Sequence, residues 1–255
     1  MATHHKVWFT LTTASRFESC RGHLIERMLM LGNDTETTGL DLHHGCKPFL
    51  VTVCSEEFKN KHWEWDVDPL TRQPIPVTNE YDMEEDLDEV CEYLDNEERV
   101  LTNANFDVSA YETVRPLMAE EWQWELTYDT TLSGHLLASN HPHNQTDMVM
   151  EYLGIDLRPY EKRMEVAVKK AITIVRRDFP EWSIAHADHP NLPSNKKNHK
   201  VWKSDLWLLR ALAKELNYPK DHENWTLVST YADSDSASAL ALHFKHVIHL
   251  KRRKL

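Results

Sequence analysis

Residues 31–40 read Leu-Gly-Asn-Asp-Thr-Glu-Thr-Thr-Gly-Leu, an apolar start that runs into two acids and a turn. We predict that residues 31–36 form a central β-strand. Side chains at i and i+2 of a strand point to the same face, so Asp34 and Glu36 would lie side by side. Two carboxylates that close repel each other unless a cation or a proton lies between them. The pair therefore either suits a hard cation such as Mg²⁺ or Mn²⁺ or belongs to a solvated surface turn.

The length and composition of the chain bound its class. Its 255 residues suit one large α/β domain, with or without an insertion, and a hydrophobic fraction of 41% is enough for a real core. No apolar run approaches the ~20 residues that a bilayer span needs, and no signal peptide is visible at the start. The cysteines form no CxxC pair, which indicates reduced thiols. We therefore expect a cytoplasmic protein without a membrane partner.

The charge of the chain is negative overall and unevenly distributed. A net charge of −12 argues against a protein that binds nucleic acid simply by being basic. Residues 80–98 contain eleven acids and no base, which is typical of a solvated helix face. Residues 158–177 contain seven bases and two glutamates. An acidic enzyme can still hold a polyanion if its bases share one face and metal ions neutralise the site.

Strand and helix patterns alternate along the rest of the chain. We predict further strands at residues 49–55, 62–67 and 99–104. Helical spacing is found at residues 81–94, 108–118, 148–153, 160–178, 206–216 and 227–242. This order favours a layered α/β sheet, in which ligand sites gather at the ends of central strands.

Three other polar positions are candidates for such a site. Asp107 follows the predicted strand of residues 99–104, where it would either cap the next helix or face a ligand. Asp129 opens another helix and has the same two interpretations. Tyr231 and Asp235 are spaced i, i+4 on the last helix and therefore share a face, which by itself would suit a structural hydrogen bond.

Taken in order, these segments resemble the three motifs of the DEDD 3′–5′ exonucleases. The segments are Asp34 to Gly39 (DTETTG), Asn103 to Asp107 (NANFD) and Tyr231 to Asp235 (YADSD). The third has the tyrosine-bearing DEDDy form, which is found in the proofreading domains of family A DNA polymerases. The segment that begins at Asp129 also resembles one in those domains. The resemblance implies an RNase H-like (DnaQ-like) mixed β-sheet flanked by α-helices.

The resemblance also implies a division of the chain and a chemistry. Residues 28–255 would form the exonuclease domain, with a basic insertion at about residues 155–203 and an extension of unknown role at residues 1–27. The implied reaction is phosphodiester hydrolysis with two Mg²⁺ or Mn²⁺ ions about 4 Å apart. One ion would be held by Asp34, Glu36 and Asp235, and the second by Asp34 together with Asp107 through water. Tyr231 would orient the attacking water, and Asp129 is a secondary candidate.

The expected substrate is single-stranded DNA or a frayed 3′ end, because phosphates bind basic groups and bases stack on aromatic rings. The candidate contacts are Thr35, Thr37, Asn103, Phe106, Lys169, Lys170, Arg176, Arg177 and Trp202. The basic residues have an alternative reading as ordinary solvated side chains, and Phe106 as part of the core. Gly32 and Asn33 stand where the family usually has bulky apolar residues, which predicts a looser strand at that point.

The same motifs leave three functions open. The first is a DNA 3′–5′ exonuclease, acting alone or with a separate DNA polymerase, as in a phage or bacterial system. The second is an RNA 3′–5′ exonuclease of the same superfamily, which would differ in its contacts to the 2′-hydroxyl. The third is a non-catalytic DnaQ-like module that binds nucleic acid or a polymerase.

Overall fold

Strand β1 (Met30–Thr37) lies in the middle of a five-stranded sheet in this computed structural model, which describes residues 29–78, 82–182 and 205–254. The predicted extension of residues 1–27 and the candidate Trp202 lie outside these ranges. Within them, no helix combines the length and the apolar character that a membrane crossing requires.

The sheet is mixed, as the sequence predicts. Its strand order is β3-β2-β1-β6-β7, in which β1 pairs antiparallel with β2 and parallel with β6. The other pairs are antiparallel β2–β3 and parallel β6–β7. The bounds of these strands are β2 (Pro48–Cys54), β3 (Asn60–Glu64), β6 (Glu98–Leu101) and β7 (Thr127–Asp129).

Two strand predictions need correction. The predicted strand of residues 62–67 is divided between β3 and β4 (Asp66–Val67), and β4 pairs with β5 (Pro74–Ile75) in a separate two-stranded sheet. Strand β7 was not predicted, because three residues are too few to show an alternating pattern.

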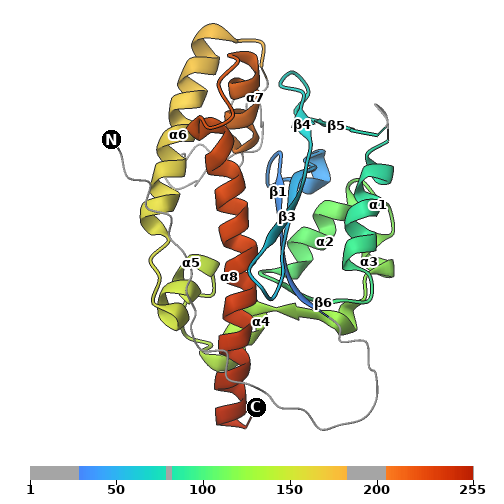
Figure 1. Cartoon of the computed structure of the whole chain (residues 1–255), viewed down its shortest axis with the longest axis vertical. Coiled ribbons are helices and arrows are strands. Elements are labelled where there is room, and N and C mark those ends of the chain that lie inside the picture. Colours follow the sequence, from blue (N-terminus) through green and yellow to red (C-terminus); the bar gives the residue numbers. More distant parts are fainter. Residues whose placement is uncertain (1–28, 79–81, 183–204, 255) are drawn as a thin grey trace.

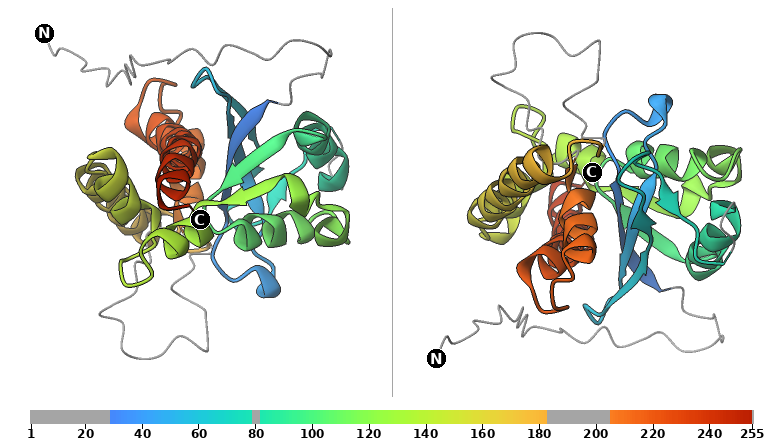
Figure 2. Two further views of the ribbon diagram at one scale, coloured as in Figure 1. Left: turned by 90° about the horizontal axis from the view of Figure 1, so that it is seen from below. Right: turned by 90° about the horizontal axis from the view of Figure 1, so that it is seen from above.

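Helices cover both faces of the sheet (Figures 1 and 2). One face carries α1 (Met83–Leu94), α2 (Ala104–Glu112) and α3 (Met118–Glu121). Helix α8 (Glu223–Arg253) lies on the other face, with α6 (Arg158–Asp178) beyond it. The remaining elements are η1 (Leu42–His44), η2 (Trp124–Leu126), α4 (Thr130–Leu137), α5 (Gln145–Met148), the π-helical turn η3 (Val149–Leu153) and α7 (Trp207–Glu215).

Two helix predictions have the wrong bounds. The predicted helix of residues 108–118 is not continuous, because α2 ends at Glu112 and the separate α3 begins at Met118. Helix α2 begins at Ala104, four positions before the expected residue 108, because Asn103 adopts a left-handed conformation (φ 63°) that starts the helix directly after β6. Helix α8 continues to Arg253, well past the expected residue 242. Its last turn carries Lys251, Arg252 and Arg253, and cations at a helix C-terminus interact favourably with the helix dipole.

The hydrophobic core has two main parts, one on each face of the sheet. Side chains such as Leu31, Val51 and Val53 pack with α1 and α2. On the other face α6, α7 and α8 pack together, so α6 shares its core with its neighbours although it lies within the predicted insertion. All seven residues of β2 are buried, as expected for a strand covered on both faces.

Helix α8 crosses the strands one after another. The Thr52 hydroxyl on β2 donates to the Ala232 carbonyl at 3.1 Å. On β1, a Cβ atom added to Gly32 would lie 2.2 Å from the Ser236 carbonyl oxygen. Farther along, Leu240 packs with Val100 of β6. The strand is therefore regularly paired at Gly32 rather than loose, and the missing side chain is what lets the helix lie against it.

Candidate metal centre

Three carboxylates from β1 and α8 meet at the site. Gly32 faces α8, so the alternation of the strand also turns Asp34 and Glu36 toward that helix. Asp235 comes from α8, close to the point at which the helix crosses β1. One oxygen from each of Asp34, Glu36 and Asp235 lies within 4.8 Å of the others.

This group has the chemistry of a site for a hard cation. All three donors are carboxylate oxygens, the ligand type that Mg²⁺ and Mn²⁺ prefer. Asp34 and Asp235 are partly accessible, and Glu36 is 9% exposed, so an ion can reach the group while water screens it less than at the surface. Three like charges so close together favour a cation between them. The acidic cluster could therefore hold a metal ion.

Tyr231 lies next to the cluster, one helical turn before Asp235. Its side chain is 5% exposed. Burial raises the pKa of its phenol well above the ordinary value, and the negative charges of Asp235, Glu36 and Asp34 raise it further. The phenol therefore stays protonated at neutral pH, so it can donate a hydrogen bond and cannot act as a base.

Asp107 approaches the end of β1 from the opposite face of the sheet. It is 3% exposed and forms hydrogen bonds with the side chain and the backbone of Thr35, the residue between Asp34 and Glu36. Burial raises the pKa of Asp107 to about 8. It is not one of the three clustered carboxylates. The structure thus places Asp107 beside the strand segment that carries Asp34 and Glu36 but separate from the acidic cluster.

The secondary candidate Asp129 has a structural role. Its carboxylate accepts hydrogen bonds from the backbone N–H groups of Thr131 at 2.7 Å and Leu132 at 3.4 Å, which caps α4. It also accepts from Asn103 at 3.2 Å and Ala104 at 2.9 Å, where α2 begins. Of the two interpretations that the sequence allowed, the structure supports the helix cap.

The side chains of Thr35 and Thr37, which were predicted as nucleic-acid contacts, turn away from the cluster of Asp34, Glu36 and Asp235. They occupy the alternate positions of β1, and both side chains are buried. Thr35 Oγ1 lies 3.0 Å from the hydroxyl of Tyr111 on α2. Thr37 Oγ1 donates to the Gly39 carbonyl at 2.6 Å. Strand alternation thus commits both side chains to the interior of the protein.

The other predicted substrate contacts lie on two helices, α2 and α6. Asn103 is exposed and Phe106 half-buried in the first turn of α2, near Asp107. The basic candidates are on the outward face of α6, where Lys169 pairs with Glu165 at 2.5 Å and Arg177 with Asp178 at 2.7 Å. Lys170 and Arg176 are exposed on the same helix.

Three residues that the sequence did not single out border the site. The Tyr160 ring lies parallel to the Tyr231 ring, with centroids 6.4 Å apart. Glu161 is close enough to raise the pKa of Tyr231, although less than burial and the clustered carboxylates do. Gln145 Nε2 donates to the backbone carbonyl of Asp235 at 2.6 Å. These residues belong to no motif, and only the packing of α5 and α6 against α8 reveals them.

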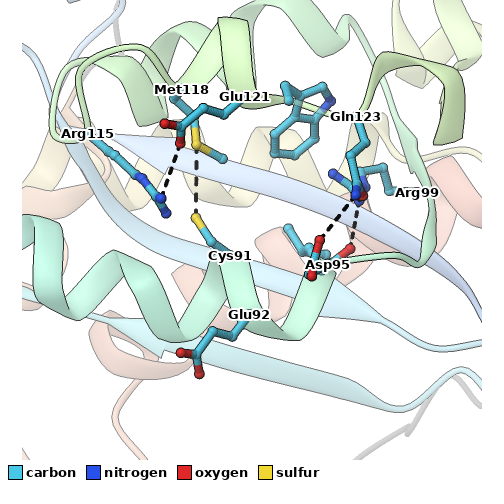
Figure 3. A pocket seen from close by; sticks show the side chains of 10 residues that line it. Cys91, Glu92, Asp95, Arg99, Arg115, Met118, Glu121 and Gln123 are labelled. Carbon is cyan, nitrogen blue, oxygen red and sulfur yellow. Dashed lines mark hydrogen bonds and ion pairs between the residues drawn. The ribbon is translucent and has the colours of Figure 1, made fainter.

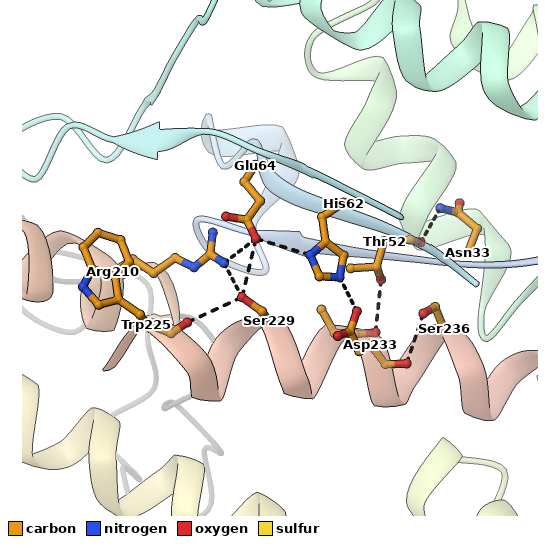
Figure 4. A network of polar contacts seen from close by, with 10 residues as sticks. Asn33, Thr52, His62, Glu64, Arg210, Trp225, Ser229, Asp233 and Ser236 are labelled. Carbon is orange, nitrogen blue, oxygen red and sulfur yellow. Dashed lines mark hydrogen bonds and ion pairs between the residues drawn. The ribbon is translucent and has the colours of Figure 1, made fainter. Parts of the chain in front are cut away.

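A polar network fixes α8 to the edge of the sheet (Figure 4). His62 on β3 forms a short hydrogen bond with Asp233, which raises the pKa of the imidazole. Arg210 on α7 donates to Glu64 at 2.7 Å and to Ser229 at 2.6 Å. These contacts lie on the side of α8 opposite Tyr231 and Asp235. They fix one side of the helix in place, while the opposite side, with Tyr231 and Asp235, faces the site.

A cavity of about 270 Å³ lies on the far face of the sheet, between α1 and α3 (Figure 3). Its two arginines are already engaged. Arg115 forms an ion pair with Glu121 at 3.2 Å, and Arg99 donates to Gln123 Oε1 at 2.7 Å while it packs on Trp122. Acidic side chains outnumber the two arginines among its lining residues, and it contains none of the predicted site residues.

A scan against protein-family models and a search of the curated proteins both found no match for this chain.

Proposed function

We propose that this protein is a metal-dependent 3′–5′ exonuclease of the DEDDy type with an RNase H-like fold. One observation carries the proposal. Carboxylate oxygens of Asp34, Glu36 and Asp235, from a strand and a helix far apart in the chain, meet within 4.8 Å beside a buried, protonated Tyr231. All four residues belong to the segments that resemble motifs of the DEDD exonucleases. The mixed sheet and its strand order are compatible with the RNase H-like fold.

The residues suggest a division of labour at this site. Asp34, Glu36 and Asp235 would hold Mg²⁺ or Mn²⁺. Asp107, on the other face of β1, would add a fourth carboxylate only after it releases its proton, which a nearby bound cation favours. When bound, such ions supply an activated water and neutralise the charge of the phosphodiester. The Tyr231 hydroxyl would orient this water by donating a hydrogen bond, because burial keeps its phenol protonated.

The rest of the site supports this role for Tyr231. The Tyr160 ring lies parallel to the Tyr231 ring, with centroids 6.4 Å apart, and forms one side of its surroundings. The Tyr160 hydroxyl is itself held by the Leu227 carbonyl, to which it donates at 2.8 Å. Single-stranded DNA or a frayed 3′ end would enter from the accessible side of Asp34 and Asp235, with the exposed bases of α6 as further contacts.

The decisive experiment digests 5′-labelled single-stranded DNA and RNA of the same sequence with Mg²⁺, Mn²⁺ or EDTA. We expect a metal-dependent ladder that shortens from the 3′ end. The substitution Asp34→Ala should lower the rate by about 10³-fold or more, because metal ions supply several kcal/mol of charge stabilisation.

Glu92→Ala is the matched control, because it removes an exposed carboxylate from α1 on the opposite face of the sheet. It should leave the ladder unchanged. The relative rates on DNA and RNA decide the substrate class. Binding of either strand without cleavage under any metal condition would contradict the proposal and favour a non-catalytic module.

A further inference from the structure

A second cavity, of about 490 Å³, lies beside the C-terminal half of α8. Its walls come from α8, from the end of α4 and from the following segment through η3. The cavity is in the size range of pockets that hold small molecules or parts of larger ligands. None of the predicted site residues lines it.

Basic side chains line one wall. Lys245, His249 and Arg253 all line the cavity and are spaced i, i+4 and i+8, so they form a row on one side of α8. Within the described residues, neither Lys245 nor His249 forms an ion pair with a carboxylate. Arg253 donates to the Leu137 carbonyl, a neutral acceptor, so its charge is also uncompensated.

The opposite wall does not neutralise this row. Glu151 is the only carboxylate among the lining residues that the structure describes. Its carboxylate is hydrogen-bonded to His141 Nδ1, at 2.9 and 3.0 Å, and it is one acid against the two charges of Lys245 and Arg253. In the cavity of Figure 3, by contrast, Arg115 is balanced by a carboxylate. A cation-lined pocket on a chain with a net charge of −12 selects an anion.

Two features relate the pocket to the proposed function. One is an aromatic ring on which a base can stack, and the other is a chain segment that also contacts the metal centre. Tyr152 lines the cavity and packs edge-on against His249, with ring centroids 5.8 Å apart. Gln145, seven positions earlier on the same segment, contacts the backbone of Asp235. Along α8, Lys245 is ten residues from Asp235, about 15 Å at 1.5 Å per residue.

We propose that this pocket binds a backbone phosphate of the nucleic-acid strand whose 3′ end lies at the carboxylates. That the pocket binds an anion follows from its own lining residues. That the anion belongs to a nucleic-acid strand rests on the proposed function. The row of basic side chains would contact the phosphate, with Lys245 and Arg253 supplying the charge, and Tyr152 would offer a surface to a neighbouring base. The pocket would thereby fix the strand upstream of the reacting bond.

The test measures fluorescence anisotropy of a labelled single-stranded oligothymidylate in EDTA, under which no cleavage occurs. Lys245→Gln should weaken binding at least about 5-fold and lower the salt slope by about 0.7, the value for one phosphate contact on a single strand. Lys251→Gln is the matched control, since it removes the same charge from an exposed position of α8 outside the pocket. It should change binding less than about 2-fold.

Equal weakening by both substitutions would overturn the inference, because it would indicate a diffuse basic surface rather than a site. His249→Gln is the second pocket variant and should also weaken binding more than Lys251→Gln does. Failure of the proposed function is separable from these results. Absence of cleavage with a retained Lys245 effect would reject the exonuclease alone, whereas cleavage with equal variants would reject the pocket alone.

Discussion

At position 32 the absence of a side chain allows α8 to lie directly on β1. The Ser236 carbonyl oxygen would be 2.2 Å from an added Cβ atom, and the Leu240 Cβ atom 3.0 Å. The nearest obstacle is helix backbone, which a rotamer change cannot move. Because Asp34 lies two positions farther on the strand and Asp235 next to Ser236, this contact also sets the distance between the two carboxylates.

We expect Gly32→Ala to lower the free energy of unfolding by about 2 to 3 kcal/mol, as overpacking of a rigid contact does. Urea denaturation of the purified variant measures this loss. Because α8 must move away from β1, the variant should also bind Mn²⁺ more weakly than the wild type in a thermal-shift titration.

Gly39→Ala provides the comparison at the end of the same segment. An added Cβ atom there would meet the side chains of Arg72 and Cys46, both at 2.6 Å, and side chains can rearrange. Gly39→Ala should therefore lower the free energy of unfolding less than Gly32→Ala does. A Gly32→Ala protein within about 0.5 kcal/mol of the wild type would contradict the close helix contact.

At the scale of elements, α8 connects the candidate site with the far edge of the sheet. After Asp235 the helix continues past β6 to β7, where the rings of His243 and Tyr128 lie 4.6 Å apart. His246 is fully buried, and its Nδ1 is 2.7 Å from the Ser133 hydroxyl on α4. Burial lowers the pKa of both His243 and His246 to about 4.

These histidines make the stability of the protein depend on pH. An imidazole in the unfolded chain has a pKa of about 6.5, so between pH 6.5 and pH 4 the unfolded state binds more protons than the folded state. The free energy of unfolding should therefore fall as the pH falls through this window. His246→Asn retains a polar group near Ser133 and removes the titrating ring, so it should reduce the loss between pH 7 and pH 5 by about 1 to 2 kcal/mol.

Urea denaturation at the two pH values measures this difference. His43→Asn makes the same substitution at an exposed histidine and is the control, for which we expect the wild-type pH dependence. If His246→Asn and the wild type lose the same free energy between pH 7 and pH 5, the buried neutral histidine is not a source of acid sensitivity.

At the scale of the whole molecule, folding brings like charges together from opposite ends of the chain. Asp34 and Glu36 on β1 and Asp235 on α8 come within reach of one another only when α8 packs on the sheet. The folded protein therefore presents the carboxylate cluster of the proposed metal site, which the unfolded chain lacks. A ligand that binds only the folded state stabilises it by mass action.

Mn²⁺ at about 100 times its dissociation constant should add about 3 kcal/mol to the free energy of unfolding. For a chain of this size this gain corresponds to a rise in Tm of roughly 5 to 10 °C, measurable by differential scanning fluorimetry. Asp235→Asn should abolish the rise, because it removes one of the three clustered carboxylates.

Asp233→Asn is the matched substitution on the other side of the same helix, where the carboxylate pairs with His62 rather than with the cluster. Its starting Tm should fall with the loss of this contact, while the rise with Mn²⁺ remains. A similar Mn²⁺ response in both variants would argue against a metal at the cluster.

The sequence by itself determined the features that depend on local geometry. The i, i+2 spacing of Asp34 and Glu36 places them on one face of a strand, and the i, i+4 spacing of Tyr231 and Asp235 places them on one face of a helix. The same periodicities predicted most strands and helices, although not β7 or the full length of α8. Local backbone geometry repeats at fixed intervals, so a pattern of side chains is enough to identify it.

Only the tertiary structure decided which faces meet. Asp235 reaches Asp34 because α8 lies close to β1 at Gly32. Asp129 caps two helices because β6 and β7 end next to each other. Motif position also does not say toward which layer a side chain turns, so the burial of Thr35 and Thr37 is visible only in the structure. Helices distant in the chain provide the contacts of Gln145, Tyr160 and the row from Lys245 to Arg253. Long-range packing has no period along the sequence, so the pattern of residues does not contain it.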